Sequence, residues 1–243
     1  MNYQTAIISQ QGGRNYNEDY CGDIVVNNNL SCWVVADGLG GHGGGDMASK
    51  LVVKTIFNKL NNQPEFAIDT LKNLFDEAQT AIIQAQKMAM ELEKMQTTAV
   101  VLLTHENQAL WGHVGDTRLY YFHNDCIQRQ TSDHSVPQLL AKAGEIKNSD
   151  IRFHEDRNRL LRSIGSEGPV RPNIEKTPTP IYSGDAFLLC TDGFWEYVFE
   201  TEMESDLMKA TTAEEWLFCM EHRLLARVPE RNDNYSAIAI KIL

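Results

Sequence analysis

Two kinds of hydrophobic pattern alternate along this chain. Short β-branched runs bounded by turn residues predict strands at residues 5–9, 30–36, 97–104, 109–114, 119–123, 186–191 and 235–242. Apolar residues spaced three and four apart predict helices over residues 46–60, 64–95 and 212–226, with Asp46 and Thr212 placed to cap two of them. Tight turns between strands, as at residues 123–125, favour antiparallel sheets. Long helices between groups of strands then predict an α+β fold in which helices cover the sheet faces.

Charge and length restrict the class of protein. The 243 residues include 22 Lys and Arg but 33 Asp and Glu, a formal net charge of −11. This balance argues against nucleic-acid or membrane-surface partners, because both are recognised first by basic side chains. The apolar runs are far shorter than the ~20 residues of a membrane helix, and the N-terminus resembles no secretion signal. We therefore expect one cytoplasmic domain over residues 1–243.

The five cysteines also favour a cytoplasmic protein. Their number is odd, their spacings are wide, and no C-x-x-C pair occurs, which predicts neither a disulfide framework nor a zinc site. We expect them to be reduced core residues, since two lie in apolar strands where a thiol behaves as a small hydrophobe. They are Cys21, Cys32, Cys126, Cys190 and Cys219.

Four carboxylates mark the ends of predicted strands beside glycine or asparagine. The pairs are Asp37-Gly38, Gly115-Asp116, Asp192-Gly193 and Asp233-Asn234. A single Asp-Gly pair is an ordinary turn. Four such acids predict a metal site instead, because carboxylates that converge repel one another unless a cation lies between them. Carboxylate and carbonyl oxygens favour a hard divalent cation such as Mg²⁺ or Mn²⁺.

Longer motifs around these acids resemble the metal-dependent protein phosphatase family, the type 2C serine/threonine phosphatases, in their short bacterial form. Eight motifs follow the family's order: GRNYNED at 13–19, VADGLGGH at 35–42, TTA at 97–99, HVGDTR at 113–118, SDHS at 132–135, RLLRSIG at 159–165, LCTDG at 189–193 and DNYS at 233–236. The resemblance implies a four-layer α-β-β-α sandwich of two antiparallel sheets flanked by helix pairs, with metal ions at one end.

The resemblance also implies which residues hold the metal ions. Asp37 would bridge two ions, and Asp116 together with Asp192 would hold a third, weaker one. The full set of implied ligands is Asp37, the Gly38 carbonyl, Asp116, Asp192 and Asp233, with Glu18 and Asp19 close by and acting partly through water.

The implied reaction is hydrolysis of phosphoserine and phosphothreonine in proteins, in one in-line step by a water that bridges two Mn²⁺ or Mg²⁺ ions. Arg14 occupies the position that grips the phosphate, for which a forked guanidinium is suited. Arg14, Asp37 and Asp192 are thus the implied catalytic residues. Animal members place a histidine, the proposed acid, where this chain has Leu39. We expect His42 to be structural.

Residues 136–155 correspond to the family's flap and are expected to contact the substrate protein. A monomer acting on the phosphoprotein products of a serine/threonine kinase is the leading hypothesis. One alternative is a catalytically weak regulator that binds phosphoproteins, which the acidic residues at every ligand position disfavour. Another is a two-metal phosphodiesterase or nuclease, which the net charge of −11 disfavours.

Overall fold

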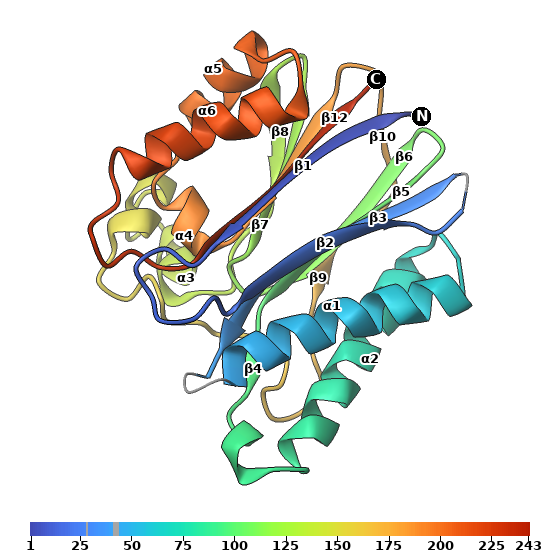
Figure 1. Ribbon diagram of the computed structural model, residues 1–243, viewed down its shortest axis with the longest axis vertical. Helices are drawn as coiled ribbons and strands as arrows, with labels where there is room; N and C mark the ends of the chain where they lie inside the picture. Colours follow the sequence, from blue (N-terminus) through green and yellow to red (C-terminus); the bar gives the residue numbers. More distant parts are fainter. Residues whose placement is uncertain (28, 41–43) are drawn as a thin grey trace.

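Two antiparallel β-sheets stack face to face, and helices cover both outer faces (Figure 1). The computed structural model describes residues 1–27, 29–40 and 44–243. The first sheet has the spatial order β1 (Tyr3–Gln10), β12 (Tyr235–Ile242), β11 (Ala186–Cys190), β7 (Arg118–His123) and β8 (Cys126–Gln130). The second has the order β10 (Thr179–Pro180), β6 (Gln108–Val114), β5 (Ala99–His105), β3 (Leu30–Leu39) and β2 (Asp19–Val25), with β4 (Gln96–Thr97) on β3 and β9 (Asn173–Ile174) on β6.

The helices form the two outer layers. Helices α1 (Gly44–Asn62) and α2 (Ile68–Gln86) pack on the second sheet, while α5 (Glu200–Lys209) and α6 (Ala213–Leu225) pack on the first. The shorter helices are α3 (Val136–Ala143), α4 (Asp192–Trp195) and the 3₁₀ helices η1 (Met90–Leu92) and η2 (Asn148–Phe153). The expected four-layer α-β-β-α sandwich is therefore confirmed. No helix within the described ranges combines the length and apolar character needed to cross a bilayer.

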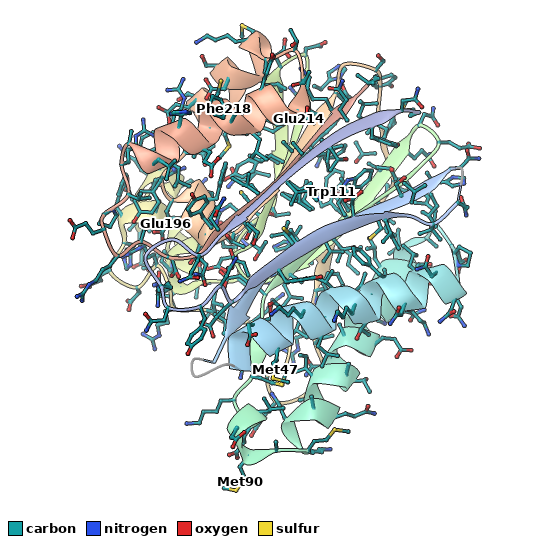
Figure 2. All side chains as sticks on the ribbon, in the orientation of Figure 1. Met47, Met90, Trp111, Glu196, Glu214 and Phe218 are labelled. Carbon is teal, nitrogen blue, oxygen red and sulfur yellow. The ribbon has the colours of Figure 1, made fainter. Side chains whose placement is uncertain are left out.

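Three hydrophobic cores hold the four layers together. One lies between α1, α2 and the second sheet, and another lies between the first sheet and α4 to α6. The third fills the space between the sheets, where Trp111 is 3 % exposed and lies edge-on to Phe187 (Figure 2). On the outer face of the first sheet, Trp216 of α6 packs edge-on against Phe122 at 5.1 Å. Burial of such large side chains provides the main stabilisation of the sandwich.

Two helix boundaries differ from the sequence prediction. Helix α2 covers Ile68–Gln86 rather than residues 64–95, because the apolar face ends there and Met88 and Met90 are 83 % and 91 % exposed. Helix α1 begins at Gly44, so Asp46 lies inside the first turn and pairs with Lys50 instead of capping the helix. The predicted cap of α6 is confirmed by a 3.1 Å hydrogen bond from a backbone N–H to the Thr212 hydroxyl.

The sequence pattern also missed several elements. Strands β2, β8, β9 and β10 and helices α3, α4 and α5 were not predicted, and the strand expected over residues 97–104 is divided into β4 and β5. Strand β8 is a largely exposed edge, so its sequence lacks an apolar alternation. The core prediction holds for Cys32 and Cys190, whereas Cys126 and Cys219 are exposed.

Candidate active site

A pocket of about 190 Å³ opens at the end of the sandwich where β3, β6 and β11 finish and β12 begins. Asp37 belongs to β3 itself rather than to the turn after it, Asp116 follows β6, Asp192 begins α4, and Asp233 precedes β12. The described residues that line the pocket are Arg14, Glu18, Asp37, Gly38, Leu39, Gly40, Asp116, Asn158, Leu160, Asp192, Asp233 and Asn234.

Strand pairing brings acids from both sheets to this pocket. Asp19 lies directly opposite Asp37 in the β2–β3 pair. Thr191, which follows β11 in the other sheet, donates its hydroxyl to Asp19 at 3.0 Å and accepts the backbone N–H of Ser236 at 3.0 Å. Asp19 is 4 % exposed and lies beneath the pocket rather than on its lining. The Thr191 hydroxyl thus joins the two sheets at the site.

Glycine is required directly after Asp37 because other backbone lies against it. A Cβ atom on Gly38 would lie 2.1 Å from the carbonyl oxygen of Gly45 and 2.6 Å from that of Glu18. The Gly38 N–H donates to the same Glu18 carbonyl at 3.1 Å. This close approach fixes the start of α1 and the Glu18 segment against the end of β3.

Two threonines fix the backbone of Asp37. Its carbonyl accepts the Thr97 hydroxyl at 2.6 Å and the Thr98 N–H at 2.8 Å. Gly115, at φ +101°, packs on Thr98, and a Cβ atom there would lie 2.4 Å from the Thr98 methyl group. The TTA motif therefore positions both the end of β3 that carries Asp37 and the turn that carries Asp116.

Removal from water and mutual repulsion raise the pKa values of these carboxyl groups. Burial raises the pKa of Asp19 to about 7, with the charge of Asp192 adding to the shift. Burial and the charge of Asp233 raise the pKa of Asp192 to about 6. Burial and neighbouring acids also hold the pKa values of Asp37 and Asp116 well above the ordinary range. The cluster therefore favours a compensating positive charge.

The donors fit a hard divalent cation. Among the described residues one ion pair reaches the cluster, from Arg14 Nη2 to Asp233 Oδ2 at 2.6 Å. A cation among the carboxylates would offset their repulsion, and oxygen ligands are those that Mg²⁺ and Mn²⁺ prefer. No three described His, Cys, Asp or Glu side chains converge at metal-ligand spacing. The acids thus define the region for ions without fixing the coordination of each one.

Asn234 organises the loop that carries Arg14. Its amide nitrogen donates to the carbonyls of Gln11 at 2.7 Å and Tyr16 at 2.9 Å, and its oxygen accepts the Glu18 N–H at 2.9 Å. Asn234 is 6 % exposed, while the Arg14 side chain is 55 % exposed. The buried side chain of Asn234 therefore holds together the loop from which the exposed Arg14 side chain reaches the pocket.

Asp116 is supported from below by an aromatic ring and an arginine. The Trp195 indole N–H donates to the Asp116 carbonyl at 3.0 Å, and the Arg118 guanidinium lies 3.4 Å above the Trp195 ring. Arg118 in turn forms two hydrogen bonds with Asp133, at 2.9 and 2.8 Å. These contacts link the Asp116 turn to the segment that enters α3.

Most of the residues predicted from the sequence come together. Arg14, Glu18, Asp37, Gly38, Asp116, Asp192 and Asp233 all line the one pocket, with Asp19 beneath it. His42 lies outside the described residues. Sequence reasoning did not assign the lining residues Asn158 and Leu160 to the site; Leu160 belongs to the RLLRSIG motif, whereas Asn158 carries no recognisable signal. It also missed the structural role of Asn234, although that residue belongs to the DNYS motif.

The chain is similar to known proteins over most of its length. A family model described as protein phosphatase 2C matches residues 9–227. The serine/threonine phosphatase stp of Listeria monocytogenes is 34 % identical over 207 residues, covering 83 % of this chain and 81 % of that protein.

Solved structures are similar over nearly the whole length. Serine/threonine phosphatase Stp1 from Staphylococcus aureus matches with a TM-score of 0.89 and 26 % identity, covering 100 % of this chain and 96 % of that one. The catalytic domain of serine/threonine protein phosphatase PstP, in complex with two manganese ions, matches with a TM-score of 0.81 and 26 % identity, covering 98 % and 97 %.

Proposed function

This chain belongs to the protein phosphatase 2C family and is a serine/threonine protein phosphatase, and we propose that the acidic pocket is its catalytic centre. The convergence of Asp37, Asp116, Asp192, Asp233 and Arg14 on one small pocket carries this proposal. Such a pocket combines anionic metal ligands with one forked phosphate donor, a combination suited to metal-assisted hydrolysis of a phosphate ester.

The acids would hold two divalent cations, Mn²⁺ or Mg²⁺, and a third near Asp116. The proposed ligands are Asp37, the Gly38 carbonyl, Asp116, Asp192 and Asp233, with Glu18 and Asp19 acting partly through water. When bound, two such ions would lower the pKa of a water and so favour its direct, in-line attack on the phosphoester. The complex of the PstP catalytic domain with two manganese ions supports this assignment by analogy.

Arg14 would bind the substrate phosphate. Nη2 of its guanidinium donates to Asp233, which leaves other N–H groups for phosphate oxygens. Because Asn234 closes the Arg14 loop, the guanidinium is held at the mouth of the pocket before substrate arrives. A positioned cation stabilises charge on the phosphate oxygens without the cost of ordering the loop during the reaction.

The departing serine or threonine oxygen needs a proton. Among the described residues that line the pocket there is no histidine, and Leu39 follows the Asp37-Gly38 pair. Leu39 has no proton to give, and we propose that water supplies it.

Residues 136–155, the flap segment, would contact the substrate protein, within one catalytic domain over residues 1–243. The segment consists of α3 and η2 and exposes the apolar side chains of Leu139 and Phe153, which are 57 % and 71 % exposed. Arg152 anchors it to the core through Glu200 and the carbonyls of Trp195 and Val198. The expected substrates are phosphoproteins made by a serine/threonine kinase.

Hydrolysis of para-nitrophenyl phosphate and of a phosphothreonine peptide, each with Mn²⁺, Mg²⁺ or chelator, tests the proposal. We expect turnover that chelator abolishes, and slower turnover of a phosphotyrosine peptide. Asp192→Asn should lose activity while circular dichroism shows a retained fold. Full activity of this variant, or of the chelated enzyme, would refute the metal assignment.

A further inference from the structure

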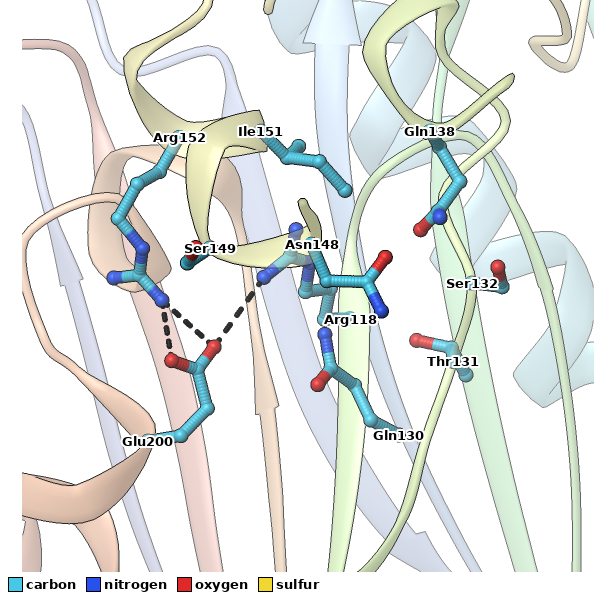
Figure 3. A pocket seen from close by; sticks show the side chains of 10 residues that line it. All are labelled: Arg118, Gln130, Thr131, Ser132, Gln138, Asn148, Ser149, Ile151, Arg152 and Glu200. Carbon is cyan, nitrogen blue, oxygen red and sulfur yellow. Dashed lines mark hydrogen bonds and ion pairs between the residues drawn. The ribbon is translucent and has the colours of Figure 1, made fainter. Parts of the chain in front are cut away.

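A second cavity, of about 440 Å³, lies between the flap segment and the first sheet (Figure 3). Gln138 of α3 and Asn148, Ser149, Ile151 and Arg152 of η2 line its flap side. The opposite side consists of Arg118, residues 130–132 and Glu200. No described residue lines both this cavity and the acidic pocket.

Two buried uncharged side chains present free donors to this cavity. Gln138 and Thr131 are each 7 % exposed. The Gln138 oxygen accepts the Asp133 N–H at 3.2 Å, while no hydrogen bond among the described residues uses its amide nitrogen. The Thr131 oxygen accepts the Leu119 N–H at 3.0 Å, which leaves its hydroxyl hydrogen free. In both Gln138 and Thr131 the side-chain oxygen already accepts a hydrogen bond, while an N–H or O–H group remains free to donate.

Arg118 adds a positive donor at the floor of the cavity. It is 3 % exposed, and three of its five N–H groups bind Asp133 and the Tyr120 hydroxyl. It also forms an ion pair with Glu200 Oε1 at 3.6 Å, longer than a hydrogen bond (Figure 3). Glu200 accepts its hydrogen bonds from Arg152. Arg118 therefore retains donor capacity toward the cavity.

The amides of Gln130 and Asn148 face each other across the mouth of the cavity and can donate as well (Figure 3). A buried site in which donors outnumber free acceptors selects a ligand rich in acceptor oxygens. We propose that this cavity binds a small oxyanion, a phosphate or carboxylate group carried by a small molecule. Gln138, Thr131 and Arg118 donate to its oxygens, and the volume leaves room for the attached organic part.

A ligand held here connects the flap segment to the sheet. Gln138 and Asn148 belong to the flap segment, whereas Arg118 belongs to β7 and stacks on Trp195. The Trp195 indole also donates to the Asp116 carbonyl, so the Trp195 ring contacts both Arg118 of this cavity and Asp116 of the acidic pocket. The proposal concerns binding alone and does not depend on the catalytic assignment.

The test is nuclear magnetic resonance of the full chain with Mg²⁺, using the side-chain amide signals of Gln138 and the indole signal of Trp195. Inorganic phosphate, methylphosphonate and succinate are titrated separately, with glycerol as the neutral control. Gln138→Glu keeps the acceptor for the Asp133 N–H but replaces the free donor with an anionic oxygen. Gln128→Glu adds the same charge on exposed β8 outside the cavity. Asn148→Asp makes a similar change at an exposed residue, where the fold should tolerate the substitution.

We expect saturable shifts of the Gln138 and Trp195 signals with at least one anion. In the variants binding is followed through the Trp195 signal, because Gln138→Glu lacks the side-chain amide. It should weaken about tenfold or more in Gln138→Glu, severalfold in Asn148→Asp and not in Gln128→Glu. Shifts with phosphate or methylphosphonate identify a phosphate site, and shifts with succinate alone identify a carboxylate site. No anion-dependent shift, equal shifts with glycerol, or equal weakening by Gln128→Glu would overturn the proposal.

Discussion

Replacing Asn234 with alanine should lower both the stability of the fold and the affinity for the substrate phosphate. Asn234 is not itself assigned to bind substrate. The change removes three hydrogen bonds, to Gln11, Tyr16 and Glu18. A buried hydrogen bond contributes about 1 kcal/mol net, so the free energy of unfolding should fall by about 2–4 kcal/mol. The same hydrogen bonds keep the loop that carries Arg14 ordered in the free enzyme.

The kinetic effect follows from the same bonds. If ordering the loop costs about 1.4 kcal/mol once Asn234 is gone, phosphate binding must supply it, and KM should rise about tenfold. The assay is para-nitrophenyl phosphate hydrolysis with saturating Mn²⁺, together with urea unfolding. Asn27→Ala is the matched control, because the Asn27 side chain also bonds to the backbone: its oxygen accepts the N–H groups of Asn29 and Leu30, at the other end of β3.

A double variant decides whether Asn234 acts through Arg14. If it does, Arg14→Ala with Asn234→Ala should have the KM of Arg14→Ala alone. Independent, multiplicative rises in KM would contradict the reasoning. So would a wild-type KM in an Asn234→Ala protein that has lost the expected stability.

Three further outcomes are expected. Hydrogen bonds from Arg227 lower the pKa of Glu202 to about 2. The stabilisation that these bonds provide is therefore complete above about pH 4.5 and is lost as the pH falls toward 2. In urea unfolding, Arg227→Gln should lower the free energy of unfolding by roughly 1 kcal/mol at pH 7 and by less at pH 3. Gly115→Ala should lower the free energy of unfolding by more than about 2 kcal/mol in the same assay. Gly144 is also at positive φ but has open space around it, so Gly144→Ala should cost about 1 kcal/mol. Equal losses would contradict the packing argument. Asp192→Asn should reduce the rate of hydrolysis about a hundredfold or more. It should nevertheless raise the thermal unfolding midpoint of the chelator-treated protein, because it removes one of the carboxylates that repel each other. A lower midpoint would argue against that repulsion.

The sequence predicts the site better than it predicts the elements around it. Asp37, Asp116, Asp192 and Asp233 all stand beside glycine or asparagine at strand ends, a local signal that survives any uncertainty in strand boundaries. Their order with the other motifs identifies the family, and membership in that family fixes the four-layer arrangement. Buried strands such as β3, β5 and β12 were predicted because their apolar runs are continuous.

Other features depend on tertiary contacts that leave no local pattern. Strand β8 is polar because it is an edge, and α5 is polar because only one narrow face is buried. Asn158 and Leu160 reach the pocket only through the path of the chain after η2. The role of Asn234 depends on carbonyls more than 200 positions away in the sequence, at Gln11 and Tyr16. Spacing along the chain cannot show such partnerships.

The pairing of β1 with β12 has a consequence for how the protein is made. Every residue from Tyr3 to Gln10 pairs with one from Tyr235 to Ile242, and β12 is the strand that separates β1 from β11. While the ribosome is still adding residues 235–242, β1 has no partner and its edge stays open to other chains. The second sheet, α1 and α2 contain their own pairings and can form earlier. Synthesis itself therefore delays activity: Asp233 and Asn234 are the last pocket residues to be translated, so a chain that stops before residue 233 carries no complete site.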